Sequence, residues 1–425
     1  MNNSSKPYIL FLLAALTAIF TYSCHPGDAG KAVLLPTGGD AVSPYLTMDE
    51  KGVPVLCWTE KAEGDSVYSL KFAWYQADRH AFGAAITVPG SGGAQTAAES
   101  MNKVAFKSDG SVVAVFGKKF LNEKNPYAGA IYYTISADKG ETWADPAFLH
   151  TDTIRDYGRG FFDLARMRTG EVAAVWLDGR HGRSEKGSAL YYNCTSAGQG
   201  FGTDRLIDKM TCECCRTALL ADAQGNLHVA FRKILYPAEK LGKPVRDLVY
   251  SASGDNGRTF STPVVISRDG WVLDGCPHTG PAMAMGGRAP AAIWFTAGGE
   301  PGLYFTGNVA GNKTRTLLSR TGRHPQLVSL GQGSLAAIWE ESVPAMTPKK
   351  PAGHHSAHGS PGGGVRVILI DPKGAEKTIF AETSSIPRHH PVMLKTQGGL
   401  LAAWVAETKA GPRIEFLDLS TRNGL

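Results

Sequence analysis

The chain has 425 residues, of which 43% are hydrophobic and 19% are charged, so it is long enough for two or three average domains or one large repeat fold and is not intrinsically disordered. Its formal net charge of +6 comes from 44 Lys and Arg against 38 Asp and Glu and forms no dense basic stripe, which argues against a nucleic-acid partner. The 50 glycines exceed the usual share of roughly 7% and favour many turns between short strands.

The chain begins with a segment typical of a secretory signal. Lys6 is the only charge before an apolar run over 8–22 that is too short for a membrane span of roughly 20 residues. The run ends in Thr-Tyr-Ser-Cys24, which resembles a bacterial lipobox, where the cysteine becomes the lipid-bearing N-terminus. We therefore expect a signal peptide over 1–24 and a short linker over 25–30.

The lipobox resemblance implies that the protein is exported and held on a lipid bilayer through Cys24, at a bacterial outer membrane or cell surface. An outer-membrane protein is then a candidate partner. Ordinary secretion, with Cys24 discarded or left free, is the alternative.

One pattern repeats along the rest of the chain: an apolar pair, a turn with glycine, and small apolar residues that end in an aromatic residue. In five of the seven copies the turn glycine lies six residues before the aromatic residue. The aromatic residues are Trp58, Phe116, Trp176, Phe231, Trp294, Trp339 and Trp404. Each copy predicts a hairpin of two short strands.

A second predicted hairpin follows most copies, which gives four strands per repeat and indicates the blades of a β-propeller. Examples are 130–135 with 143–150, and 248–252 with 260–267. The last repeat has a third strand, 413–417, and then the chain ends, so we expect strand 31–35 to supply the fourth and close the ring. The sequence predicts one all-β domain over 31–425 with seven four-stranded blades and a Pro/Gly/His-rich loop insert at 344–364. Six blades, or an irregular pair of β-sandwiches, are the alternatives.

Two turns share the pattern S-x-D-x-G-x-T-[W/F]. They consist of Ser136, Asp138, Gly140, Thr142 and Trp143, and of Ser253, Asp255, Gly257, Thr259 and Phe260. In such a turn the Asp carboxylate can accept backbone N–H groups, and the glycine permits a positive φ. The pattern resembles the Asp box of the sialidase (BNR-repeat) superfamily. Because the boxes of that family are structural, the resemblance implies a stabilising role for both turns.

The same resemblance implies that ligands bind at the mouth of the central funnel, where the innermost strand of each blade begins. Cationic residues and metal-binding types are concentrated just before these strands. The candidate ligand-binding residues are Arg159, Arg216, His278, Arg323, His324, Arg388, His389 and His390, and the second repeat adds Glu99 and Met101. Solvated loop residues that only cap strand ends are the alternative.

Sialidases clamp a substrate carboxylate with three arginines, whose guanidinium groups bind carboxylates bidentately, and use a tyrosine nucleophile with an acidic acid/base. The resemblance would make Arg159, Arg323 and Arg388 the triad, with Asp156 and Tyr157 as catalytic candidates. The family's first arginine motif is absent. We therefore expect a membrane-anchored propeller that binds an anionic or glycan ligand, with an exo-sialidase-like glycoside hydrolase as the alternative.

Six cysteines remain besides Cys24. Cys57 and Cys194 lie in separate repeats and are expected to be free thiols. The others, which lie in neighbouring repeats at the same face, are Cys212, Cys214, Cys215 and Cys276. In an exported protein one or two disulfides among them are expected.

The cysteine cluster also fits a second hypothesis, a copper or zinc site. Its ligands would be Cys214, Cys215, Cys276 and His278, with the histidines of the 344–364 insert as a further metal-capturing group. The protein would then be a metal-binding or scaffolding propeller; otherwise no cofactor is required.

Overall fold

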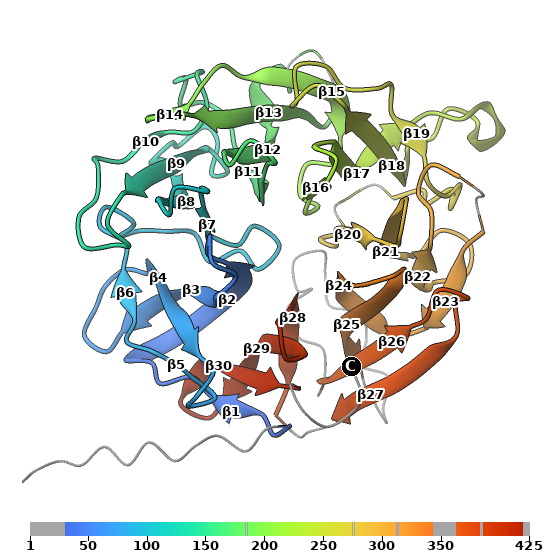
Figure 1. Cartoon of the computed structure of the whole chain (residues 1–425). Helices are drawn as coiled ribbons and strands as arrows, with labels where there is room; N and C mark the ends of the chain where they lie inside the picture. The colour runs from blue at the N-terminus through green and yellow to red at the C-terminus, as the bar shows by residue number, and fades with distance from the viewer. Residues whose placement is uncertain are drawn as a thin grey trace, which may run out of the picture.

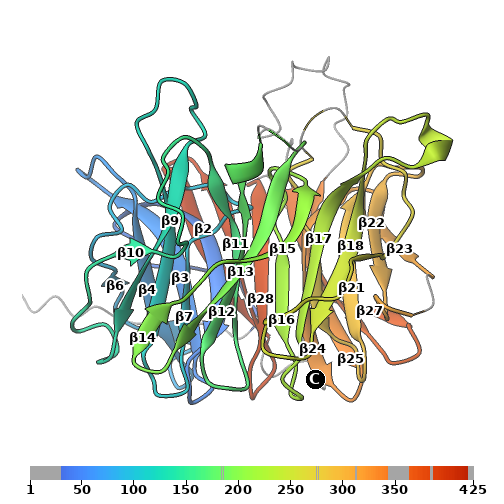
Figure 2. The ribbon, with the colours of Figure 1, turned by 90° about the horizontal axis from the view of Figure 1, so that it is seen from above.

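The computed structural model describes residues 30–182, 184, 186–273, 275, 277–311, 314–342, 363–382 and 386–419. The predicted signal peptide and linker, Cys24, Cys276 and most of the 344–364 insert lie outside these residues. The sheets are arranged around a common centre (Figure 1), and their strands run along the axis of the ring (Figure 2). The helical elements of the described residues are two 3-10 turns, η1 (Gly179–His181) and η2 (Ala238–Lys240). In this part of the chain no helix has the length and apolar character to cross a membrane.

The strands of the first half follow the predicted repeats. The first sheet contains β2 (Gly39–Met48), β3 (Pro54–Ala62), β4 (Ser69–Gln76), β5 (Ala81–Phe82) and β6 (Ile86–Thr87). The second contains β7 (Lys103–Phe106), β8 (Val112–Lys119), β9 (Gly129–Ser136) and β10 (Ala147–Phe148). A nine-stranded sheet contains β11 (Arg159–Arg166), β12 (Val172–Asp178), β13 (Ser188–Ser196), β14 (Gln199–Phe201), β15 (Arg205–Thr211), β16 (Ala218–Ala221), β17 (Leu227–Leu235), β18 (Val245–Ser253) and β19 (Val264–Val265). Its two halves are joined by a single residue pair between β15 and β17, Thr211 with Lys233.

Three four-stranded sheets complete the ring. One contains β20 (Ala282–Met285), β21 (Pro290–Thr296), β22 (Gly302–Thr306) and β23 (Thr316–Ser319). The next contains β24 (Gly322–Gly331), β25 (Ser334–Ser342), β26 (Gly363–Ile370) and β27 (Glu376–Glu382). The last contains β28 (Arg388–Lys395), β29 (Leu400–Thr408), β30 (Gly411–Asp418) and β1 (Val33–Leu34). β1 pairs antiparallel with β30, so Val33 lies opposite Phe416.

The apolar core is divided among the spaces between neighbouring sets of strands. Seven buried clusters each combine residues of two neighbouring sets, including the two halves of the nine-stranded sheet. One of the clusters joins Trp58 of β3 to Phe416 of β30, the chain's beginning to its end. Each set of strands is therefore held by apolar contacts on both of its faces.

The repeated tryptophans are the largest members of this core, and each of the five indoles is almost fully buried. Their N–H groups all donate to a carboxylate: Trp58 to Glu60, Trp176 to Asp178, Trp294 to Asp269, Trp339 to Glu341 and Trp404 to Glu415. A buried indole N–H needs such a partner. These acidic residues, three on the second strands of their sheets and two elsewhere, therefore complete the core.

The two Asp boxes have the hydrogen bonds that the turn pattern predicts. In the first box Asp138 Oδ1 accepts the Thr142 N–H at 2.8 Å, and Ser136 Oγ accepts the Gly140 N–H at 2.7 Å. Asp255 and Ser253 make the same contacts in the second box. A Cβ on Gly257 would lie 2.2 Å from the ring of Tyr192, which belongs to β13. The second box thus packs closely against the preceding set of strands.

Candidate functional site at the centre of the ring

The strands nearest the centre share a backbone distortion close to their starts. β2, β11, β24 and β28 each contain a register shift there. A non-glycine residue with φ near +50° lies in each shift, and a fifth precedes β20: Ser43, Phe161, His324, His390 and His278. A left-handed backbone is unfavourable for such residues and costs about 1–3 kcal/mol. Three of the five are histidines, at corresponding places in consecutive sheets.

A buried ion pair crosses the centre from the segment before β7 to the segment before β16. Arg216 Nη1 donates to Glu99 Oε1 at 3.2 Å, and both side chains are at least nine-tenths buried. Glu99 Oε2 accepts the Gly280 N–H at 2.8 Å, and Arg216 Nη2 donates to the carbonyl oxygen of Pro325 at 2.8 Å. This pair therefore connects segments at the starts of four inner strands.

Two of the left-handed histidines meet beside this ion pair. The ring centroids of His324 and His390 are 4.1 Å apart. Glu340 serves both residues: its Oε1 lies 2.9 Å from His324 Nδ1, and its Oε2 accepts the His390 backbone N–H at 2.9 Å. The angle of the first contact is poor for a hydrogen bond, so we treat it as an electrostatic contact.

Burial and this contact shift the protonation of the three groups in different directions. Burial opposes ionisation of Glu340, but His324 holds the pKa of that carboxyl at about 2. Burial lowers the pKa of His324, but Glu340 raises it more, so the pKa lies above its ordinary value. Burial and the neighbouring His324 place the pKa of His390 well below its ordinary value. His390 is therefore neutral at pH 7, with the lone pair of one ring nitrogen available to a ligand.

Two of the predicted anchoring arginines are already paired with carboxylates. Arg159 Nε lies 3.1 Å from Asp178 Oδ2, and its Nη2 lies 2.9 Å from Asp152 Oδ1. Arg388 Nε lies 2.6 Å from Glu415 Oε2, and both arginines are buried. Asp178 and Glu415 are the carboxylates that also accept indole N–H groups. These two arginines therefore already have a role in the core.

Arg323 is in a different situation. Its guanidinium lies 3.4 Å from the ring centroid of Phe295 and donates to the carbonyl oxygen of Gly322 at 3.0 Å. Among the described residues no carboxylate lies within ion-pair distance of it. Burial lowers the pKa of Arg323, and the field of Glu340 opposes that shift. Four arginines are predicted to bind the ligand. Among the described residues, Arg323 is the one of these four whose guanidinium contacts no carboxylate.

The catalytic candidates lie away from the central cluster. Tyr157 donates its hydroxyl to Asp152 Oδ2 at 2.5 Å, and the Arg159 guanidinium lies 4.5 Å from its ring centroid. Burial and the bond to Asp152 raise the pKa of Tyr157. Asp156 is exposed. Asp152, which contacts both Tyr157 and Arg159, cannot be identified from the sequence, because nothing in its local sequence distinguishes it.

The cysteines form a second buried group near the centre. Cys212 and Cys215 are free thiols with Sγ atoms 3.4 Å apart, so the expectation of a disulfide is not met by this pair. The Cys215 contact and Arg246, whose Nη1 lies 3.1 Å from Cys212 Sγ, lower the pKa of Cys212 against the effect of burial. Cys57 and Cys194 are free, as predicted. A disulfide or metal at Cys276 stays a prediction.

The remaining histidines of the prediction flank the same region. His278 is exposed, and its carbonyl oxygen lies 3.3 Å from His324 Nε2. The ring centroid of His389 lies 6.2 Å from that of His390. Met101 is buried next to the Glu99 segment. The structure thus brings His278, His324, His389 and His390 to one side of the centre.

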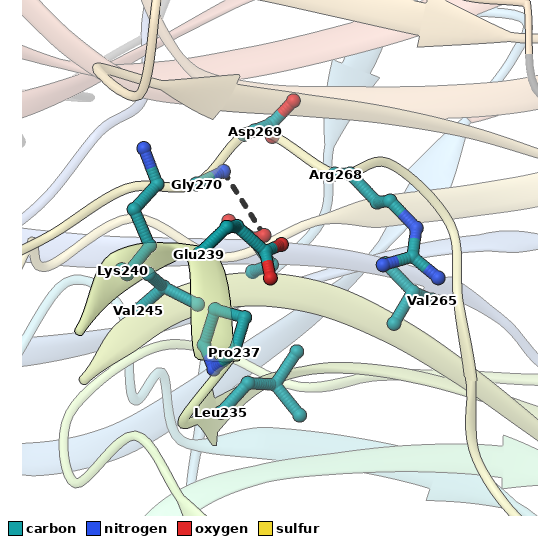
Figure 3. Close-up of a pocket in the computed structure, with 10 residues that line it drawn as sticks. Leu235, Pro237, Glu239, Lys240, Val245, Val265, Arg268, Asp269 and Gly270 are labelled. Carbon is teal, nitrogen blue, oxygen red and sulfur yellow. Dashed lines mark hydrogen bonds between the residues drawn. The ribbon is translucent and has the colours of Figure 1, made fainter. Parts of the chain in front are cut away.

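A small pocket lies elsewhere, against β17, β18 and the segment that follows β19 (Figure 3). Its volume is about 140 Å³, and its apolar lining consists of Leu235, Pro237, Val245 and Val265. The Gly270 N–H donates to Asp247 Oδ2 at 3.0 Å on its wall. None of the predicted ligand-binding residues lines it.

Comparisons with known proteins support the fold at low sequence identity. An ulvan lyase bound to a GlcA(1-4)Rha3S saccharide is 11% identical, with a TM-score of 0.56 over 92% of this chain and 96% of that one. The polysaccharide lyase Uly1 is 11% identical, with a TM-score of 0.52 over 91% of each chain. The Trypanosoma rangeli sialidase in complex with sialic acid is 10% identical, with a TM-score of 0.51 over 93% of this chain and 59% of that one.

No protein-family model and no curated protein sequence matches this chain. The likeness to solved structures establishes an all-β fold of the sialidase-like propeller kind.

Proposed function

We propose that this protein is an exported, lipid-anchored propeller that binds an anionic or glycan ligand at the mouth of its central funnel. Its structural neighbours include a sialidase with bound sialic acid and a lyase with bound acidic saccharide. Both of those ligands carry carboxylates, so a binding cation at the funnel suits ligands of this kind. The lipid anchor at Cys24 and an outer-membrane partner belong to the same proposal.

Seven blades, closed by β1, are the architecture we propose for this ring. The pairing of β1 with β30 and the seven inter-sheet clusters support it, because a closed ring of seven blades has seven interfaces. The single residue pair that joins the halves of the nine-stranded sheet is too little to make them one blade.

The observation that carries the binding proposal is the state of Arg323. Arg159, Arg216 and Arg388 have carboxylate partners, and a guanidinium so paired gains little from an external anion. Arg323 keeps its charge next to an aromatic ring, and stacking on Phe295 fixes the guanidinium plane. We therefore assign the anion contact to Arg323.

The test compares Arg323→Ala with Arg320→Ala, an exposed arginine that pairs with Glu300 on the same sheet region. Binding of carboxylated and sulfated glycans is measured on an array and then by calorimetry. We expect Arg323→Ala to weaken binding by about 1.5–3 kcal/mol, the range for hydrogen bonds to charged groups, and to leave the melting temperature nearly unchanged. Equal binding by both variants and the wild type would refute the assignment.

Glycoside hydrolysis is the second candidate function. It rests on Tyr157, whose hydroxyl donates a hydrogen bond to the carboxylate of Asp152. A nucleophile and the base that activates it are expected to be paired in this way. Release of sialic acid from a model substrate, lost in Tyr157→Phe, would establish it.

A further inference from the structure

We propose that Glu99, His324 and His390 form a binding site for a divalent first-row transition metal, with Zn²⁺ as the reference ion. Each residue offers one ligand atom, and these atoms lie within 4.8 Å of one another. The three residues come from the segment before β7, from β24 and from β28. This site differs from the cysteine-based site that the sequence predicts, and it goes beyond the glycan-binding proposal.

The donor set decides the class of metal. Two imidazoles and one carboxylate suit Zn²⁺, Fe²⁺, Co²⁺, Ni²⁺ and Cu²⁺, whereas Ca²⁺ and Mg²⁺ prefer sites built of oxygen atoms alone. Three protein ligands leave at least one coordination position for water or a ligand. Ligand atoms around Zn²⁺ lie about 2.0–2.2 Å from the ion, so the three side chains must close inward to bind it.

Glu99 retains the capacity to bind an ion despite its two hydrogen bonds. An ionised carboxylate offers about four lone-pair sites. Arg216 takes one on Oε1, and the Gly280 N–H takes one on Oε2. These two donors also fix the carboxylate in place, so the metal would find it already oriented.

Glu340 plays the orienting part for the histidines. Metal-binding imidazoles usually direct their second nitrogen to a carboxylate, which fixes the ring and strengthens the ligand. Glu340 Oε1 lies 2.9 Å from His324 Nδ1, so Nε2 is the nitrogen that we assign to the metal, and on binding it would give up its 3.3 Å contact with the His278 carbonyl oxygen. Glu340 Oε2 also holds the backbone of His390. One buried carboxylate thereby contacts the imidazole of His324 and fixes the backbone that carries His390.

The charges and the backbone of the site are consistent with a cation. Two carboxylates, Glu99 and Glu340, lie around the two imidazoles together with a single guanidinium, that of Arg216. His324 and His390 also adopt the costly left-handed backbone, which brings their rings to a centroid distance of 4.1 Å. Shared coordination of a metal would explain why two imidazoles are held so close together.

The experiment uses Co²⁺ as a spectroscopic substitute for Zn²⁺. The purified chain is freed of metal with a chelator and titrated with Co²⁺, followed by visible absorption and by calorimetry. We expect binding of one equivalent with visible d–d bands and no sulfur-to-cobalt charge-transfer band in the near ultraviolet. Zn²⁺ should then displace the cobalt and abolish the d–d bands.

Variants separate the proposed site from its neighbours. We expect Glu340→Gln to weaken Co²⁺ binding by about 10–100-fold, the usual effect of removing an orienting partner, and His390→Ala to weaken it further. His389→Ala, one residue away, and Cys212→Ser are matched controls that should bind as the wild type does. Circular dichroism and melting curves identify any variant that fails to fold. Glu99→Gln, which keeps the size of the side chain and one of its two acceptor oxygens but removes the charge, then replaces such a variant.

Three outcomes would overturn the proposal: no Co²⁺ binding at micromolar protein, binding that His390→Ala and Glu99→Gln both leave intact, or a thiolate charge-transfer band lost in Cys212→Ser. These outcomes are independent of the glycan-binding proposal, because metal binding is measured without glycan. Arg323→Ala should lose glycan binding and keep Co²⁺ binding.

Discussion

Replacement of Glu340 by glutamine should make the unfolding free energy of the protein vary less with pH in the acidic range. The glutamine keeps an acceptor for the His390 N–H but loses the charge that faces His324. His324 lowers the pKa of Glu340 from 4.5 to about 2 in the folded state. A shift of about 2.5 units at 1.36 kcal/mol per unit corresponds to about 3 kcal/mol of unfolding free energy, which is an upper figure for the loss in Glu340→Gln.

The sign of the effect follows from the direction of each shift. Because folding lowers the pKa of Glu340, its contribution is present above pH 4.5 and is lost as the pH falls toward 2. Because folding raises the pKa of His324, its contribution is present below pH 6.5 and is lost as the pH rises through the raised value. Both shifts describe one ion pair, so their energies are not added. The largest difference between wild type and variant is expected between about pH 4.5 and 6.5.

The assay is urea unfolding at a series of pH values, with chelator present, followed by the fluorescence of the buried tryptophans. Glu300→Gln is the control, because Glu300 is half exposed in its pair with Arg320. We expect Glu340→Gln to be less stable than wild type at pH 5.5, with a much smaller difference at pH 2.5. A constant difference at both pH values would mean that the loss comes from packing, and the electrostatic argument would be wrong.

Three further predictions concern the ring itself. Deletion of 31–35 should lower the melting temperature, because β30 would lose its partner β1; an unchanged melting temperature would contradict this. Mass spectrometry of unreduced peptides should find a disulfide that includes Cys276. Free thiols at all four cysteines of the cluster, together with one bound metal per chain, would favour the cysteine metal site instead. Gly257→Ala should destabilise the fold by about 1–3 kcal/mol because its Cβ would overlap Tyr192, whereas Gly242→Ala, also at positive φ but with nothing within 4 Å, should cost less in the same thermal melts.

The sequence predicts the strands well because each repeat carries its own signals. The turn glycine and the aromatic residue that follows it correctly place β3, β8, β12, β17 and β25, and the third strand predicted at 413–417 is β30. The strand predicted over 260–267 is only β19, two residues long. Only Phe260 of the predicted range belongs to the preceding Asp box.

The arginines could not be assigned from their positions alone. Arg159 and Arg388 begin inner strands, which made them candidates for an open funnel. In the structure they are paired with carboxylates that also accept tryptophan N–H groups. The sequence holds one clue to the partner of Arg159. Asp178 lies two residues after Trp176, as Glu60 lies two residues after Trp58, and both carboxylates accept the indole N–H.

The central cluster depends on the ring and not on local sequence. Glu99 is far in sequence from the two histidines, and the segments that carry them meet only when the ring is assembled. Glu340 was missed for the same reason: within its strand it follows Trp339 and reads as an ordinary strand end. Only a structure reveals that it contacts both His324 and His390.

The left-handed residues near the starts of the inner strands bear on which substitutions the ring can accept. The same backbone, with φ between 47° and 54°, is adopted by a serine, a phenylalanine and three histidines in one chain. The conformation is therefore imposed by the surrounding strands and does not depend on the side chain that occupies it. Substitutions at these places should exchange the chemistry presented near the axis while the ring stays intact, so a protein engineer could equip the centre with new ligating or acidic groups one blade at a time.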